Sequence, residues 1–190
     1  MKLASSALPA LLLTMNVFAA NAEKPLFDFS TATNATHWQV VNDDVMGGIS
    51  TSRFEVTNGV AVFRGEVSLE NNGGFASVRS LPAKQELAGG DAFVIRVRGD
   101  GRRYKFTART DRTFDRAIYQ LTFATKKDAW EEHRLLLRDF VPTFRGRVLP
   151  GEPPLDPASV TSLGFLISDK HAGPFRLEID WIKAVKSPPP

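Results

Sequence analysis

The chain has no cysteine among its 190 residues, and this absence removes several classes of protein at once. Disulfide frameworks, thiolate metal centres and cysteine nucleophiles all require a residue that the sequence does not contain. Only three histidines occur, His37, His133 and His171, and they show no His-x-x-x-His spacing, so a zinc site is not expected. We therefore expect no metal, no cofactor and a core that is held together by packing alone.

Dense charge of one sign is also missing. The chain has 24 Lys and Arg against 21 Asp and Glu, a formal net charge of +3. Without a dense basic run the electrostatic signature of nucleic-acid binding is absent, and nucleic acid is not expected as a partner. The apolar content of 43% and the charged content of 24% are ordinary for a globular protein, and the length fits one domain with a real core.

Long hydrophobic runs are lacking too. Residues 8–20 are mostly apolar but too few for a confident membrane span, and the small-x-small site Ala20-Asn21-Ala22 follows them. Residues 1–22 therefore have the pattern of a secretory signal peptide, with an uncleaved anchor as the alternative. The sequence predicts an exported protein, periplasmic or secreted, with one domain over residues 23–186 and a Pro-rich tail at 187–190. No stable membrane span is expected once the leader is cleaved.

Helical periodicity is scarce, whereas period-2 alternation recurs along the chain. In the clearest case Phe175, Leu177, Ile179 and Trp181 alternate with charged residues, which predicts a half-buried strand with Trp181 in the core. Many short strands joined by polar turns predict an all-β, single-domain β-sandwich of jelly-roll type with few short helices. The other alternating segments lie around residues 37–41, 51–56, 60–67, 93–98, 104–109, 117–123, 135–137 and 163–167.

Several connections between these segments can be interpreted. Gly99-Asp100-Gly101 has turn composition, so segments 93–98 and 104–109 are predicted to pair as a half-buried hairpin. Residues 82–87 and 157–162 each begin with proline, which suits the first position of a helix, and each is predicted to form a turn or two.

Two polar loops rich in Asn, Asp and Gly stand out as one candidate binding site. Asx side chains hydrogen-bond nearby backbone, and glycine permits positive φ or close approach, so each Gly-Gly pair is predicted to contain a positive φ. A structural turn rarely needs methionine, which favours an exposed, contacting Met46 over one that plugs the core. The candidate residues are Asn42, Asp43, Asp44, Met46, Gly47, Gly48, Asn72, Gly73, Gly74 and Phe75.

The acidic residues of the first loop allow two further interpretations. Asp43 and Asp44 could act as general acid and base of a hydrolase, but neighbouring side chains point apart, so loop capping is favoured. Asn42 and Asp44 could supply oxygen ligands to Ca²⁺, although the sequence shows no full ligand loop. No catalytic or metal-binding residue is therefore predicted.

Arginine and tryptophan supply the remaining candidates. Arg79, Arg98 and Arg109 lie on the polar faces of three predicted strands, and on neighbouring strands they would line a groove for a carboxylate or polar ligand. The alternative is an ordinary solubilising surface. Trp130, beside Asp128, is the candidate aromatic for stacking on a sugar ring. Arg79, Arg109 and Trp130 thus join the candidate binding residues.

Several long motifs of the chain resemble a known protein family. They are Asn42-Asp43-Asp44-Val45-Met46-Gly47-Gly48-Ile49-Ser50, Phe63-Arg64-Gly65, Asn72-Gly73-Gly74-Phe75-Ala76-Ser77-Val78-Arg79, Thr143-Phe144-Arg145-Gly146, Leu163-Gly164-Phe165 and Gly173-Pro174-Phe175-Arg176-Leu177. Together they are similar to the complex I intermediate-associated protein 30 family, over nearly all of the chain beyond the leader. The resemblance implies a galactose-binding-domain-like β-sandwich and, for the mitochondrial members, a non-enzymatic role in assembling respiratory complex I.

Three function classes follow. The resemblance favours a non-enzymatic binding module that engages protein clients in assembly or folding. The fold type and the predicted export favour an exported carbohydrate-binding module as the alternative. A hydrolase is the third, supported only by the carboxylates that are present.

Overall fold

The computed structural model describes residues 23–85, 87, 89–113 and 116–186. The leader predicted over residues 1–22 and the tail predicted over 187–190 lie outside the described residues. Within the described part of the chain, no helix has the length and apolar character needed to cross a membrane.

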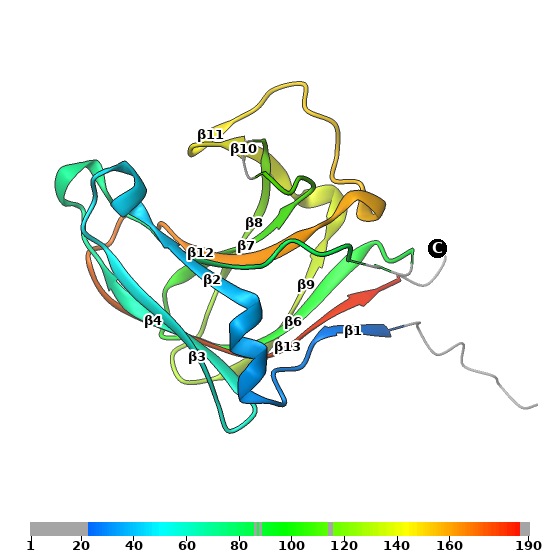
Figure 1. Ribbon diagram of the computed structural model, residues 1–190, viewed down its shortest axis with the longest axis horizontal. Coiled ribbons are helices and arrows are strands. Elements are labelled where there is room, and N and C mark those ends of the chain that lie inside the picture. Colours follow the sequence, from blue (N-terminus) through cyan, green and yellow to red (C-terminus); the bar gives the residue numbers. More distant parts are fainter. Residues whose placement is uncertain (1–22, 86, 88, 114–115, 187–190) are drawn as a thin grey trace, which may run out of the picture.

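Two antiparallel sheets are stacked as layers, which confirms the predicted all-β sandwich (Figure 1). The six-stranded sheet has the order β3-β4-β13-β6-β9, with β1 paired to β13, and the seven-stranded sheet has the order β11-β10-β8-β7-β12-β5-β2. The first contains β1 (Glu23–Phe27), β3 (Thr51–Thr57), β4 (Val60–Val67), β6 (Ala92–Arg98), β9 (Trp130–Leu136) and β13 (Gly173–Val185). The second contains β2 (Trp38–Asn42), β5 (Ala76–Ser80), β7 (Arg103–Arg109), β8 (Ile118–Ala124), β10 (Val141–Phe144), β11 (Arg147–Val148) and β12 (Ser162–Ile167).

The core lies between the sheets because alternate residues of each strand point inward. Phe93 on β6 and Phe106 on β7 are fully buried and belong to opposite sheets. Their ring centroids are 5.2 Å apart with an interplanar angle of 61°, the edge-to-face arrangement that aromatic pairs prefer. Burial of such side chains contributes about 1.5–3 kcal/mol each, which allows a chain without disulfides to hold this fold.

The predicted hairpin across Gly99-Asp100-Gly101 is wrong. β6 pairs with β13 and β9, whereas β7 pairs with β12 and β8, so the chain passes from one sheet to the other at this turn. A hairpin and a sheet-to-sheet crossing bury the same alternating faces, and for this reason the pattern did not separate them. Asp100 fixes the crossing by accepting hydrogen bonds from the backbone N–H groups of Arg102 at 3.0 Å and Arg176 at 2.8 Å.

The predicted burial of Trp181 is also wrong. The pairing of β13 with β6 shifts register between Ile179 and Trp181, which marks a β-bulge at Asp180. One extra residue reverses the alternation, so that Ile179 and Ile182 are buried while Trp181 is only partly buried. Its ring instead lies 4.2 Å from Nζ of Lys183.

Short 3₁₀ helices are the only helical elements in the described ranges: η1 (Ala32–His37), η2 (Asp43–Met46), η3 (Glu70–Asn72), η4 (Leu137–Asp139) and η5 (Pro157–Ser159). The last confirms the turn predicted from Pro157. The helical turn predicted after Pro82 is absent from the described residues 82–85 and 87. There the N–H groups of Ala83 and Gln85 donate to the carbonyls of Thr161 and Val160. A helical turn would need these N–H groups to bond to carbonyls within their own segment.

Candidate functional site

The carboxylate of Asp43 joins the two loops that the sequence singled out. Asp43 is fully buried. Its Oδ1 accepts the Ser50 N–H at 2.9 Å, and its Oδ2 accepts the Ser50 hydroxyl at 2.6 Å and the N–H groups of Gly74 at 2.7 Å and Phe75 at 3.2 Å. Figure 1 shows the two loops, which contain η2 and η3, side by side at the left-hand end of the sandwich. Asp43 therefore sets how the β2–β3 connection meets the β4–β5 connection.

The four glycines of these loops have two different roles. Gly47 has φ of +90° and Gly74 has φ of +126°, which confirms that each pair contains a positive φ. Gly48 and Gly73 instead allow close approach to the buried carboxylate. A Cβ on Gly48 would lie 2.4 Å from Cγ of Asp43, and one on Gly73 would lie 2.6 Å from its Oδ2. Both loops thus pack directly on Asp43 because neither carries a side chain at the contact.

Hydrogen bonding keeps Asp43 ionised. Burial by itself raises the pKa of Asp43, but the hydrogen bonds from Ser50, Gly74 and Phe75 outweigh burial and hold its pKa below the usual value. A carboxylate that is buried and accepts four hydrogen bonds within the protein cannot reach a substrate as a general acid or base. The capping interpretation of Asp43 is the one that fits this geometry.

The same anchoring directs four apolar side chains outward. Val45, Met46, Ile49 and Leu69 are 67%, 62%, 50% and 48% exposed, and we call this group the apolar tip. Three of them are on the Asp43 loop, and Leu69 is on the loop that Asp43 binds. Met46 is thus exposed and does not plug the core.

The remaining loop candidates differ in how exposed they are. Asp44 and Asn72 are exposed, whereas Phe75 is partly buried. Asn42 is partly buried, and its Oδ1 accepts the hydroxyl of Ser52 at 2.6 Å. This hydrogen bond occupies one acceptor position of the Asn42 amide oxygen. In the described ranges, no group of three or more His, Asp or Glu residues could hold a metal ion.

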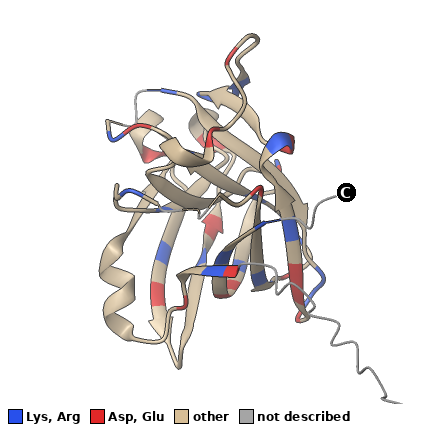
Figure 2. Cartoon of the chain, turned by 90° about the vertical axis from the view of Figure 1, so that its right-hand side faces the viewer, with Lys and Arg blue, Asp and Glu red and all other residues tan. Residues whose placement is uncertain are grey.

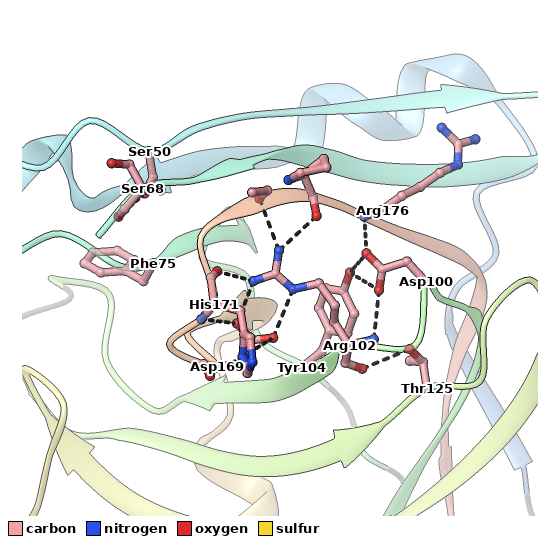
Figure 3. A network of polar contacts seen from close by, with 12 residues as sticks. Ser50, Ser68, Phe75, Asp100, Arg102, Tyr104, Thr125, Asp169, His171 and Arg176 are labelled. Carbon is pink, nitrogen blue, oxygen red and sulfur yellow. Dashed lines mark hydrogen bonds and ion pairs between the residues drawn. The ribbon is translucent and has the colours of Figure 1, made fainter. Parts of the chain in front are cut away.

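Arg102 fixes a third loop at this end of the sandwich, the connection between β12 and β13 (Figure 3). Its Nε and Nη2 donate to both oxygens of Asp169 at 3.0 and 2.6 Å. Its guanidinium also donates to the carbonyls of His171 at 2.5 Å, Gly173 at 3.2 Å and Pro174 at 2.9 Å. One planar side chain therefore holds the whole connection in place.

Arg102 and Asp169 stabilise each other's charge. The hydrogen bonds that Arg102 donates to Asp169 raise the pKa of Arg102. Burial raises the pKa of Asp169, but the hydrogen bonds that it accepts from Arg102 and from the His171 N–H bring its pKa below the usual value. The Arg102 loop lies beside the Asp43 loops, since Gly173 pairs with Val67. Figure 3 accordingly shows Ser50, Ser68 and Phe75 next to the His171 segment. Sequence reasoning missed Arg102 because its turn was interpreted as a simple hairpin.

The three arginines proposed for a shared groove do not all meet. Arg79 on β5 is opposite Gly164 of β12, and Arg109 on β7 is opposite Ser162 of β12, so these two flank one strand of the seven-stranded sheet. Arg98 is on β6 in the other sheet, where its guanidinium pairs with Glu178. Only Arg79 and Arg109 therefore remain as a pair.

Trp130 does not join the loops either. It begins β9, at the opposite edge of the six-stranded sheet from β3, the strand that the Asp43 loop enters. The guanidinium carbons of Arg96 and Arg98 lie 5.5 and 5.1 Å from its ring centroid. A sugar-binding cleft that combines Trp130 with the Asx side chains is consequently not formed.

The architecture places the chain among carbohydrate-binding-module-like β-sandwiches. The family 11 carbohydrate-binding module from Clostridium thermocellum, solved with a β-1,3-1,4-mixed-linked tetrasaccharide, superposes with a TM-score of 0.67 at 14% identity, over 89% of this chain and 98% of that one. The agarase AgWH50C superposes with a TM-score of 0.59 at 14% identity, over 87% of this chain and 25% of that one. At such identity the similarity establishes the fold alone.

The family follows from the sequence. The model of the complex I intermediate-associated protein 30 family matches residues 27–179, and the chain belongs to this family. The mitochondrial complex I intermediate-associated protein 30 of Mus musculus is 27% identical over 184 residues, covering 86% of this chain and 56% of that protein. The Drosophila melanogaster protein of the same name is 27% identical over 189 residues, covering 87% and 64%. The chain thus spans less than two thirds of these two relatives.

These relatives overturn the predicted location. The mouse, Drosophila and Neurospora crassa proteins are each named as mitochondrial. The export to a periplasm or to the outside that was predicted from residues 1–22 is therefore wrong. A short apolar stretch near the start of a chain is compositional evidence only, and the pattern was not specific enough to identify the compartment.

Proposed function

We propose that this protein is a non-enzymatic protein-binding module that acts on an intermediate in the assembly of complex I, and that it contacts its partner through the apolar tip. The observation that carries the proposal is the exposure of Val45, Met46, Ile49 and Leu69 together on two loops that a buried carboxylate holds in place. The names of its relatives supply the kind of partner.

The tip has the properties of a contact surface. Grouped apolar side chains gain free energy when a partner covers them, and methionine adapts to the shape of the opposing surface. The Asp43 hydrogen bonds fix the loops before binding, so less conformational entropy is lost on association. Asp44 and Glu70 are exposed on the same loops and give the tip an acidic border. We therefore expect a partner whose apolar patch is bordered by Lys or Arg.

The absence of enzymatic activity is part of the proposal. Asp43 and Asp169 are the carboxylates with lowered pKa nearest this end of the sandwich, and both use their oxygens to hold loops together. Catalysis requires convergent titratable groups that can reach a substrate. The geometry of these two residues supports a structural role for each.

A matched pair of valines tests the proposal. Val45 is 67% exposed on the tip, and Val148 is 61% exposed on β11 of the seven-stranded sheet. We would compare Val45→Ala combined with Met46→Ala against Val148→Ala, by affinity capture from mitochondria and quantitative mass spectrometry. The tip variant should lose most of its complex I subunits, because contact anchors contribute about 2 kcal/mol or more to binding. Equal capture by both variants and the unchanged protein would refute the tip as the contact.

A further inference from the structure

The two sheets differ in charge. Within the seven described strands of the seven-stranded sheet there is no Asp or Glu, although Lys and Arg are present. The six-stranded sheet carries both signs, and several of its carboxylates form ion pairs, such as Arg64–Glu55 at 2.7 Å and Arg176–Glu178 at 2.6 Å. Figure 2 marks Lys and Arg in blue and Asp and Glu in red along the chain. A negative ligand that approaches the outer face of the seven-stranded sheet therefore meets no carboxylate on its strands.

A hollow of about 200 Å³ lies where this outer face meets the connection between β12 and β13. Lys105 on β7 is opposite Thr122 on β8. Both side chains point away from the core, because their neighbours Phe106 and Phe123 are buried. The strands thus supply one wall of the hollow, and the β12–β13 connection supplies the other. Its lining residues are Arg103, Lys105, Thr122, Ser168, Asp169 and Lys170.

Asp169 is the one carboxylate among these lining residues, and its charge is already matched. Both of its oxygens accept hydrogen bonds from Arg102, at 3.0 and 2.6 Å. The same guanidinium donates to the carbonyl of His171, so Arg102 binds the residues on either side of Lys170. Lys170 has φ of +63°, which is uncommon for a residue other than glycine. Arg102 therefore both neutralises the acid of the hollow and holds the backbone that carries Lys170.

The three other charged side chains of the hollow are cations without a matching anion. Among the described residues, no side-chain hydrogen bond or ion pair involves Arg103, Lys105 or Lys170. Arg103 and Lys170 are exposed, whereas Lys105 is only partly exposed. Burial lowers the pKa of Lys105, because its ammonium group is partly removed from water. A negative group in the hollow would stabilise the charged form of Lys105.

We propose that this hollow binds the phosphate group of a small molecule, with Arg103, Lys105 and Lys170 around the phosphate oxygens. A phosphate group carries a charge of about −1.5 to −2 near pH 7 and three acceptor oxygens, whereas a carboxylate carries one charge and two oxygens. Three cations therefore match phosphate better than carboxylate. Arginine and lysine both bind phosphate, the first through its planar donors and the second as a compact charge.

The neutral lining residues and the size of the hollow agree with a small ligand. The hydroxyls of Thr122 and Ser168 can donate to phosphate oxygens that the cations do not reach. The volume of about 200 Å³ is below the range of about 300–1,000 Å³ that is usual for larger ligands. None of the lining residues belongs to the apolar tip, so the failure of either proposal would not decide the other.

Isothermal titration of the full chain at constant ionic strength tests the site with three probes. Inorganic phosphate presents the free ion, glycerol 3-phosphate presents a phosphate ester, and acetate presents a carboxylate. At least one of the two phosphates should bind about ten-fold or more tightly than acetate. Tighter binding of glycerol 3-phosphate would assign the hollow to an ester, and tighter binding of inorganic phosphate would assign it to the free ion. No binding of either phosphate, or equal binding of acetate, would overturn the proposal.

Matched substitutions locate the binding. Lys105→Gln combined with Lys170→Asn removes two of the three cations, and asparagine tolerates the positive φ at position 170. This variant should bind the preferred phosphate about ten-fold or more weakly, because charge-assisted hydrogen bonds are lost. Arg53→Gln combined with Lys84→Gln removes the same net charge at exposed positions outside the hollow and should leave the affinity unchanged.

A second variant keeps the test decisive if the first one does not fold. Arg103→Gln combined with Lys170→Asn changes only exposed side chains of the hollow, and thermal melting would check that it folds. It should also weaken binding of the preferred phosphate by about ten-fold. Phosphate binding that a folded hollow variant retains, or that the control variant loses to the same extent, would refute the site.

Discussion

The carboxylate of Asp43 accepts a hydrogen bond at 2.7 Å from the backbone N–H of Gly74, a residue 31 positions further along the chain. This contact joins the connection that leaves β2 to the connection that leaves β4. Both connections run between the two sheets, so a single buried charge determines how the sheets are linked at this end. The position of the apolar tip depends on that linkage, because its residues are on the two connections that Asp43 joins.

The first prediction concerns Asp43→Asn. The amide would place an NH₂ group against backbone donors that now face a carboxylate oxygen, leaving buried groups unsatisfied. We expect the free energy of unfolding to fall by roughly 3 kcal/mol, since a charged acceptor of hydrogen bonds is lost. Urea unfolding measures this change. Asp44→Asn, at the adjacent exposed position, is the control and should change stability by less than about 0.5 kcal/mol.

The second prediction concerns pH. The pKa values of Asp43 and Asp169 are both lowered on folding, so each carboxylate contributes stability that is present above its unfolded pKa of about 3.9 and is lost as the pH falls through its folded value. The free energy of unfolding should be nearly constant from about pH 7 to pH 5 and should decline below about pH 4. Asp43→Asn should show a shallower decline. Identical pH profiles for the two proteins would contradict the assignment.

The third prediction separates the glycines by mechanism. Gly47→Ala adds a Cβ in open space, so it costs only the strain of a positive φ, about 1–2 kcal/mol. Gly48→Ala places its Cβ within 2.4 Å of Asp43 and must displace the carboxylate from its hydrogen bonds, so it should cost more. Thermal melts of both variants give the ranking. If Gly47→Ala lowered the melting temperature more than Gly48→Ala did, the close packing of Gly48 on Asp43 would not be the stronger constraint on this loop.

The fourth prediction concerns the stability of the tip. Met46→Ala removes a side chain that is 62% exposed, and we expect a change in unfolding free energy of less than about 0.5 kcal/mol. Phe165→Ala, at a fully buried position, should lose roughly 3–5 kcal/mol by comparison. Denaturant unfolding of both variants gives the contrast. A large loss at Met46 would show that this side chain supports the fold.

The fifth prediction concerns Arg102→Lys. An ammonium group keeps the charge but cannot reproduce the donors that reach Asp169 and the carbonyls of His171, Gly173 and Pro174 at the same time. Residues 169–174 should therefore exchange their amide hydrogens faster, while the core strands keep their protection. Hydrogen exchange followed by mass spectrometry resolves this segment. Unchanged protection of the loop would mean that lysine is sufficient there.

Local pattern was enough to predict the sandwich, because alternating apolar residues mark the face of each strand that must be buried. It was also enough to predict the positive φ values at the Gly-Gly pairs. The pattern failed where a choice depended on distant partners. The turn at Asp100 leads to the other sheet because β7 finds β12 and β8, and the bulge at Asp180 turns Trp181 outward. Neither the partner strands nor the bulge has a signature within its own segment.

The candidate sites also depend partly on local sequence and partly on residues far along the chain. That Asp43 caps a loop could be expected from its neighbours, but that it binds Gly74 depends on a connection far along the chain. Arg79 and Arg109 were recognised individually, whereas Arg98 was grouped with them because strand order is not visible in the sequence. The absence of acidic residues from one sheet becomes apparent only when the strands are assigned to their sheets.

The position of β12 and β13 has a consequence for how this chain folds during its synthesis. β12 lies between β5 and β7, and β13 lies between β4 and β6, so the interior strand that completes each sheet is made last. Until residues 162–185 have left the ribosome, the earlier strands have unpaired edges in both layers and no route to the native order. Folding of this sandwich must therefore wait until residues 162–185 have been made, and the strands made earlier need protection from aggregation until then.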